Sequence, residues 1–99
     1  MVLLHTVLVR PEPGASSADF DALTSQIVSI AERLCGSGNY DVGPNTTEEP
    51  LDQGYTFGFI LRFQDRRALA GYHADPEHDI LSRRIQELAE TVLVFDLQT

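Results

Sequence analysis

The chain contains no lysine and no tryptophan, and its only cysteine is Cys35. Without lysine there is no side-chain amine for a Schiff base or for a lysine general base. A single cysteine cannot form a disulfide within the chain, and its place before Gly36 at a predicted helix end favours packing over nucleophilic chemistry. No apolar run approaches the length of a membrane span and no signal peptide is recognisable, so we expect a cytoplasmic protein.

Positive charge is also scarce. The seven basic residues are all arginine and face fifteen acidic ones, which gives a formal net charge of -8. An acidic surface of this kind lacks the positive patch that nucleic acids and anionic membranes require, so we expect neither as a partner. The exclusive use of arginine is associated with GC-rich genomes and therefore hints at a bacterial source.

Ninety-nine residues, 42% of them hydrophobic, are enough for one domain spanning 1–99. The polar, acidic composition of the stretch from Asn45 to Gly54 predicts a mobile loop. The hydrophobic periodicity predicts four strands and three helical segments, in chain order a strand at 2–9, a helix at 18–35, strands at 39–43 and 55–63, helices at 66–73 and 76–90, and a strand at 91–97.

This βαββαβ order, with its second helix broken, predicts an α+β fold of the ferredoxin-like type, in which helices cover one face of a four-stranded antiparallel sheet. The other face would remain apolar, because it carries Leu4, Leu8, Ile60 and Phe95 together with neighbouring leucines. A second copy of the chain is the simplest way to bury such a face. We therefore predict a homodimer in which two sheets face each other as an α+β barrel.

The break between the last two helices is the strongest candidate for a site. Asp75 is a good N-cap and Pro76 suits the first helical position. His78 then lies in the first turn on the same face as Leu81, while Tyr72 lies on the apolar face of the preceding helix. An imidazole and a phenol thus converge at the break. A buried histidine bonded to a backbone carbonyl and an ordinary core tyrosine are the structural alternatives.

Several of these features together resemble one known family. They are His5 in an apolar first strand, the run from Gly54 to Thr56, Tyr72 followed by the run to His78, and the closing Val94-Phe95-Asp96. The chain resembles the stress-responsive A/B barrel (Dabb) family over essentially its whole length. The family is dimeric, and its best-understood enzyme is a plant cyclase that closes a linear tetraketide thioester by intramolecular aldol condensation without a metal or organic cofactor.

The resemblance implies that Tyr72 and His78 are catalytic. Against that cyclase, Phe57 stands where a pocket histidine is found, Ile27 where a pocket tyrosine is found, and Ala89 where an aromatic residue is found. The chemistry is therefore expected to be similar and the substrate different. The expected pocket lining consists of the polar residues His5 and Asp96 and of a set of apolar residues. The apolar residues are Val7, Ile27, Phe57, Phe59, Leu81, Ile85, Val92 and Val94.

An aldol cyclisation needs a base and a hydrogen-bond donor for the developing oxyanion. His78 can be the base, because imidazole titrates near neutral pH and a helix N-terminus disfavours its charged form. Tyr72 can be the donor. The three histidines show no metal-ligand spacing, so we expect no metal.

We predict a cofactor-independent, polyketide cyclase-like enzyme that acts on a small apolar poly-β-carbonyl substrate in bacterial secondary metabolism, such as antibiotic biosynthesis. One alternative is a non-catalytic dimeric barrel that responds to stress or binds a small ligand. A heme- or quinone-handling monooxygenase of the wider α+β barrel group is a third, for which no specific residue set stands out.

Overall fold

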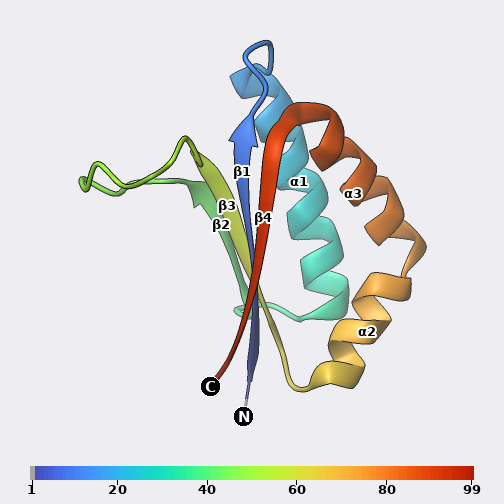
Figure 1. Cartoon of the computed structure of the whole chain (residues 1–99). Coiled ribbons are helices and arrows are strands. Elements are labelled where there is room, and N and C mark those ends of the chain that lie inside the picture. The colour runs from blue at the N-terminus through green and yellow to red at the C-terminus, as the bar shows by residue number, and fades with distance from the viewer. Residues whose placement is uncertain (1) are drawn as a thin grey trace.

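The chain folds as a four-stranded antiparallel sheet with helices on one face (Figure 1). The computed structural model describes residues 2–99. Its elements are β1 (Leu3–Pro11), α1 (Ser17–Leu34), β2 (Tyr40–Pro44), β3 (Phe57–Phe63), α2 (Arg66–Ala74), α3 (Pro76–Leu88) and β4 (Ala89–Gln98). The strands lie in the order β2-β3-β1-β4. This is the ferredoxin-like α+β fold that the sequence predicts.

Strand β1 lies in the middle of the sheet and sets its two faces. It pairs with β3 on one side and with β4 on the other, so that His5 lies opposite Leu61 and also opposite Asp96. Every second residue of β1 is buried beneath the helices, namely Leu3, His5, Val7 and Val9. The residues between them point to the outer face, as the period of two predicts.

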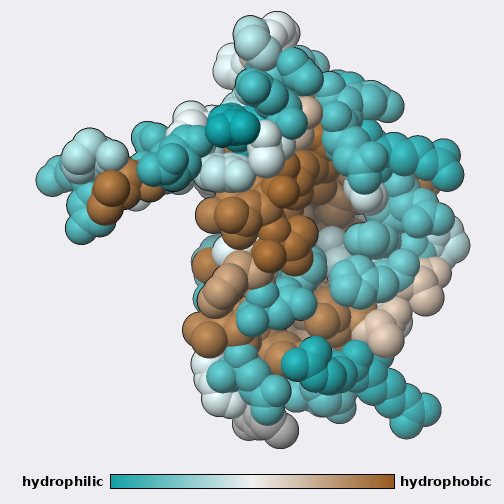
Figure 2. Space-filling model, viewed as in Figure 1, coloured by the Kyte–Doolittle hydropathy of each residue, from teal (hydrophilic) through white to brown (hydrophobic). Residues whose placement is uncertain are grey.

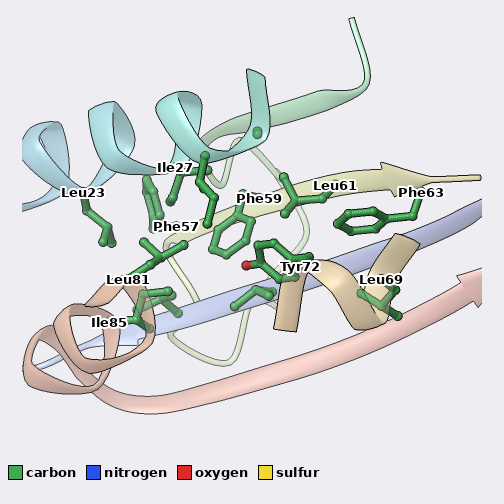
Figure 3. Packing of buried hydrophobic residues seen from close by; sticks show 14 of the residues in the cluster. Leu23, Ile27, Phe57, Phe59, Leu61, Phe63, Leu69, Tyr72, Leu81 and Ile85 are labelled. Atoms are coloured by element: carbon green, nitrogen blue, oxygen red, sulfur yellow. The ribbon is translucent and has the colours of Figure 1, made fainter. Parts of the chain in front are cut away.

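Helix α1 covers the β3 side of the sheet. It begins with a capping box, because the Ser16 side chain accepts a hydrogen bond from the Asp19 backbone N–H and the Asp19 side chain accepts one from the Ser16 N–H. Its buried residues are Leu23, Ile27, Ile30 and Ala31. Figure 3 shows Leu23 and Ile27 pointing toward Phe57 and Phe59 of β3, which fill the space between helix and sheet.

Strand β3 begins at Phe57, two residues later than predicted. The residues before it belong to a turn, since the Tyr55 N–H donates to the Asp52 carbonyl and Gly54 has a positive φ of 83°. Tyr55 is therefore not on the buried aromatic face where the alternation places it. Its ring instead lies beneath the guanidinium of Arg10, 5.8 Å from the ring centroid.

Strand β4 begins at Ala89, directly after α3 ends at Leu88, whereas the sequence predicts a helix to Glu90. Pairing with β1 explains the early start, because Pro11 lies opposite Ala89 after a register shift and the Glu12 N–H donates to the Leu88 carbonyl. As an edge strand, β4 has little helical cover on its inner face. Val92 and Val94 are consequently 36% and 57% exposed.

The outer face of the sheet is apolar and uncovered in the single chain. Leu93, Phe95 and Leu97 of β4 are all exposed. Beside them a groove of about 450 Å³ runs along β2, β3 and the base of the β2–β3 loop. That loop projects away from the body of the domain (Figure 1). Among residues 2–99, none of the helices has the length and apolar character needed to cross a membrane.

Gly58 lets β3 lie close to β1 on this outer face. A Cβ atom at this position would stand 2.9 Å from Cδ2 of Leu8 and 3.1 Å from the Val7 carbonyl oxygen. Glycine within a strand is typical of a position where another backbone comes close, and here that backbone belongs to β1.

Candidate active site

The turn between α2 and α3 holds the two candidate catalytic residues in fixed positions. The Asp75 side chain caps α3 by accepting a hydrogen bond from the Glu77 N–H at 2.9 Å. The Asp75 N–H donates to the Tyr72 carbonyl at 3.2 Å, and the His78 N–H donates to the Asp75 carbonyl at 2.9 Å. Asp75 is thus bonded to both Tyr72 and His78 through the backbone.

Arg33 fastens this turn to the end of α1. Its guanidinium donates to both carboxylate oxygens of Asp75, at 2.8 and 2.9 Å, and to Glu77 at 2.8 Å. This two-point contact fixes direction as well as distance. It also holds the pKa of the Asp75 carboxyl below its usual value, and the Glu77 N–H adds to that effect. The capping carboxylate therefore stays charged to low pH.

The rings of Tyr72 and His78 meet beside the turn. Their centroids lie 4.7 Å apart with an interplanar angle of 68°, an edge-to-face contact. Tyr72 is 2% exposed and packs on Phe63 on its other side. Figure 3 shows its hydroxyl oxygen directed toward the side of the core where Phe59 and Leu81 lie. The two residues therefore lie together, as the sequence predicts.

A second pair of polar residues comes from the sheet. Nδ1 of His5 lies 2.6 Å from Oδ1 of Asp96 across the β1–β4 ladder. The His5 ring is buried and its centroid lies 5.6 Å from that of Tyr72. With Nδ1 donating to the carboxylate, Nε2 of His5 is the ring nitrogen left for other contacts.

These side chains surround a cavity of about 250 Å³ between α3 and the inner face of β1 and β4. Figure 2 shows the hollow beside the brown side chains of the sheet and the teal surface of α3. The lining is largely apolar with a cluster of rings at one side, and consists of His5, Val7, Phe59, Tyr72, His73, His78, Leu81, Ser82, Ile85, Gln86, Val92, Val94 and Asp96. No arginine is among them.

Two residues expected in the pocket lie elsewhere. Ile27 and Phe57 do not line the cavity, because α1 covers that part of the sheet and their side chains fill the core beneath it. Phe57 instead packs on Phe20, with ring centroids 5.1 Å apart, and borders the outer groove. The cavity lies nearer the β4 edge, where helical cover is thinner.

Three polar lining residues were not anticipated, namely His73, Ser82 and Gln86. The side chain of His73 is exposed, but its ring also contacts that of His78, with the centroids 5.2 Å apart. The spacing of these residues along the helices could have predicted their place in the cavity. His73 follows Leu69 by four positions, and Ser82 and Gln86 follow His78 by four and eight.

Burial determines the protonation states of Tyr72 and His78. It raises the pKa of the Tyr72 hydroxyl well above the ordinary value, with a further increase from nearby Cys35. Burial also lowers the pKa of His78, and the positive charge that His73 can carry lowers it further, while Asp79 acts in the opposite sense. Near neutral pH the site therefore combines a protonated phenol with a neutral imidazole.

The Nδ1 atom of His78 is buried and has no hydrogen-bond partner within the described part of the chain. An unpaired buried polar atom costs about 1–3 kcal/mol, so this nitrogen calls for a partner from outside the chain, such as a water or a ligand atom. The structural alternative of a histidine bonded to a backbone carbonyl is not realised at this nitrogen.

Within residues 2–99, no group of three or more histidine, cysteine, aspartate or glutamate side chains is arranged to hold a metal ion. The groups that the cavity offers are a neutral imidazole, a phenol hydroxyl and a carboxylate-bound imidazole. Such a set can remove a proton from carbon and stabilise an oxyanion in an apolar space.

Comparisons with known proteins place this geometry in context. Residues 3–99 match the Dabb family model, described as the stress responsive A/B barrel domain. No curated protein sequence matches the chain. Among solved structures, a dimeric ferredoxin-like protein of unknown function from Jannaschia sp. CCS1 is 25% identical, with all of both chains covered and a TM-score of 0.88.

Two plant proteins are also similar in structure. The protein At3g17210 from Arabidopsis thaliana is 25% identical, with 98% of this chain and 94% of that chain covered and a TM-score of 0.86. A hydroxynitrile lyase from Passiflora edulis is 14% identical, with 97% and 91% covered and a TM-score of 0.82. At that identity the likeness to the lyase is one of fold alone.

Proposed function

The chain belongs to the stress-responsive A/B barrel (Dabb) family, and we propose that its cavity is the active site of a cofactor-independent enzyme. The proposed reaction is an intramolecular, aldol-type cyclisation of a small poly-β-carbonyl substrate. His78 is the general base and Tyr72 is the hydrogen-bond donor. This fold occurs in at least one enzyme, since the structurally similar protein from Passiflora edulis is a hydroxynitrile lyase.

One observation carries this proposal. The rings of Tyr72 and His78 are 4.7 Å apart at the wall of an apolar cavity, and Nδ1 of His78 is buried without a partner in the described residues. A core histidine with only a structural role would have this nitrogen paired. An imidazole that is not tied up by hydrogen bonds at Nδ1 and that lines an apolar cavity suits a general base for a carbon acid.

One proton moves through the proposed reaction, and one carbon–carbon bond forms. Neutral His78 removes a proton from the carbon between two carbonyl groups, and the resulting enolate attacks a more distant carbonyl of the same molecule to form a carbon–carbon bond. The attacked oxygen becomes an alkoxide, which the Tyr72 O–H stabilises by a hydrogen bond. The imidazolium then returns its proton to that oxygen. Burial keeps His78 neutral at the start and keeps Tyr72 protonated throughout.

The lining favours an uncharged substrate of modest size. A cavity of about 250 Å³ is at the small end for ligand sites, and most of its lining side chains are apolar. No arginine faces it, so a free carboxylate or phosphate would find no guanidinium partner there, and the carboxylate of Asp96 would repel it. A compact polyketide-like chain with neutral carbonyl groups satisfies both conditions.

We propose further that the chain is a homodimer that buries the outer face of its sheet. Leu4, Leu8, Ile60 and Phe95 lie on this face, which no helix covers. The similar protein from Jannaschia sp. CCS1 is described as dimeric. A second copy with the same apolar face is the simplest complementary partner.

The enzymatic proposal can be tested without knowing the natural substrate. Ethyl acetoacetate serves as a probe, because base catalysis exchanges the protons between its two carbonyl groups for deuterium in D₂O, as followed by proton NMR. We expect exchange above the buffer blank with the native protein. His78→Gln should reduce that excess by about 10²–10⁴-fold, and Tyr72→Phe should reduce it by about 10²-fold or more.

The matched control is Arg67→Gln, which removes an exposed charge from α2 outside the cavity. It should exchange at the native rate. Native protein that only matches the blank would contradict the proposal. If the probe then still bound in the cavity, as shown by shifts of the His78 ring resonances, the non-catalytic ligand-binding function would be favoured instead.

A further inference from the structure

His73 occupies a position between water and the buried part of the site. It lies in the last turn of α2 and its side chain is exposed, in contrast to the buried His5 and Tyr72. Its ring nevertheless lies against the rings of the three other polar ring residues of the cavity. The centroid distances are 5.5 Å to His5, 5.5 Å to Tyr72 and 5.2 Å to His78.

A general base at His78 must exchange its proton with the solvent whenever it catalyses isotope exchange at carbon, and in any turnover in which that proton does not return to the product. His78 is only partly exposed, and its Nδ1 is shielded from water. A neighbouring group that can both accept and release a proton would connect it to the solvent. Such a group must lie near the imidazole and must also reach water.

The other groups that face His78 are less suited to this task. Tyr72 of α2 is buried and already protonated. His5 of β1 is buried and bonded to Asp96 of β4. Asp75, at the turn before α3, is fully engaged by Arg33 and the Glu77 N–H.

Asp79 of α3 is exposed, but it is the next residue along the helix after His78, and it does not line the cavity. His73 is therefore the group that combines a titratable ring, contact with His78 and access to water.

We infer that His73 is a further acid–base residue of the cavity, whose imidazole passes protons between the solvent and His78. The inference rests on the function proposed above. Neutral His73 takes the proton from the His78 imidazolium, directly or through one water, and releases it to the solvent. Only N–H bonds form and break, and both rings return to the neutral state. The ring separation of 5.2 Å is compatible with a single bridging water.

The test uses the same deuterium exchange of ethyl acetoacetate. His73→Gln keeps a polar side chain on the helix but cannot carry a proton, and we expect it to slow exchange by about tenfold or more. Free imidazole added to the buffer should restore the rate, because it replaces the missing carrier. His73→Arg places a permanent positive charge at this position without a proton that can be transferred, so it should be equally slow and equally rescued. Arg67→Gln should match the native protein at every imidazole concentration.

The outcomes separate this inference from the proposed function. If the native protein is active and depends on His78, while His73→Gln retains the native rate, only the role of His73 is overturned. The same holds if His73→Arg retains the rate, since charge and not proton transfer would then be what matters. If the native protein does not exceed the buffer blank, the proposed function fails and the inference fails with it.

Discussion

His5 and Asp96 are ninety-one positions apart in the chain, and their side chains lie 2.6 Å apart. The sheet brings them together, because β1 and β4 pair in antiparallel register with His5 opposite Asp96. An ionised carboxylate can only accept, so Nδ1 of His5 must donate. The contact therefore fixes which nitrogen of a buried ring remains available to the cavity. It also means that the two ends of the chain jointly define one wall of the site.

We first predict that Asp96→Ala destabilises the protein and releases the His5 ring. His5 is 4% exposed, and a buried donor left without a partner costs about 1–3 kcal/mol. Urea denaturation measures the loss. Nitrogen NMR of the imidazole should show the proton on Nδ1 in the native protein and a mixture of the two neutral tautomers in the variant.

Glu32→Ala is the control for this prediction. It removes an exposed carboxylate that accepts a hydrogen bond from the Tyr40 hydroxyl at 2.9 Å. Its free energy of unfolding should change by no more than about 0.5 kcal/mol, as is usual on the surface. If Asp96→Ala and Glu32→Ala lowered the free energy of unfolding equally, the contact between His5 and Asp96 would contribute no more to stability than an exposed surface contact.

The second prediction concerns pH. Burial lowers the pKa of His78 below its ordinary value of 6.5, and the charges of His73 and His5 add to this. The folded state therefore binds the proton less readily than the unfolded chain. The free energy of unfolding should then be fully retained above pH 6.5 and should fall as the pH drops from there through the folded pKa.

Two variants check the cause of this pH dependence. His78→Gln should have a flatter profile of unfolding free energy in that interval, because the titrating group is gone. In His73→Gln, the pKa of His78 measured by NMR should rise, since a nearby positive charge has been removed. A native His78 that titrates at or above 6.5 would contradict both the burial argument and the proposed neutral base.

The third prediction separates the capping role of Asp75 from its role at the site. Asp75→Ala removes the cap of α3 and the contact with Arg33, and should cost about 1–2 kcal/mol. Asp65→Ala removes the cap of α2, where the side chain accepts from the Ala68 N–H at 2.9 Å, and should cost about 1 kcal/mol. Urea denaturation gives both values.

Only the first of these substitutions should disturb the site. The Asp75 side chain fastens the turn between Tyr72 and His78 to Arg33, whereas Asp65 lies at the far end of α2. The ring resonances of His78 and Tyr72 should therefore shift in Asp75→Ala and stay in place in Asp65→Ala. Unchanged ring resonances in Asp75→Ala would mean that packing alone positions the pair.

Much of this arrangement is readable from local pattern. Alternation in β1 predicts that His5 points inward, and the N-cap with Pro76 predicts the break that brings Tyr72 to His78. These signals work because they depend on neighbours within a few residues. The boundaries of β4 depend instead on pairing with β1, which local pattern does not contain, and for this reason the pattern predicts helix at Ala89 where the structure has strand.

The position of the cavity is the part that local pattern does not determine. Alternation places Phe57 and Phe59 on the same face of β3, yet only Phe59 lines the cavity. The difference arises from where α1 and α3 cross the sheet, which is a matter of packing between distant segments. His73 was missed for a related reason, because an exposed residue near a turn gives little sign of which rings surround it.

The last prediction concerns assembly. Phe95 and Ile80 are both 57% exposed, but Phe95 lies on the outer face of the sheet and Ile80 lies on α3. If two sheets meet face to face, Phe95→Glu places an unpaired charge in the interface, and burying such a charge costs several kcal/mol. We expect the native protein and Ile80→Glu to have the mass of two chains by sedimentation equilibrium, and Phe95→Glu to have the mass of one. A dimer that survives Phe95→Glu but is lost in Ile80→Glu would move the interface from the sheet to the helices, and a native monomer at micromolar concentration would rule out the dimer altogether.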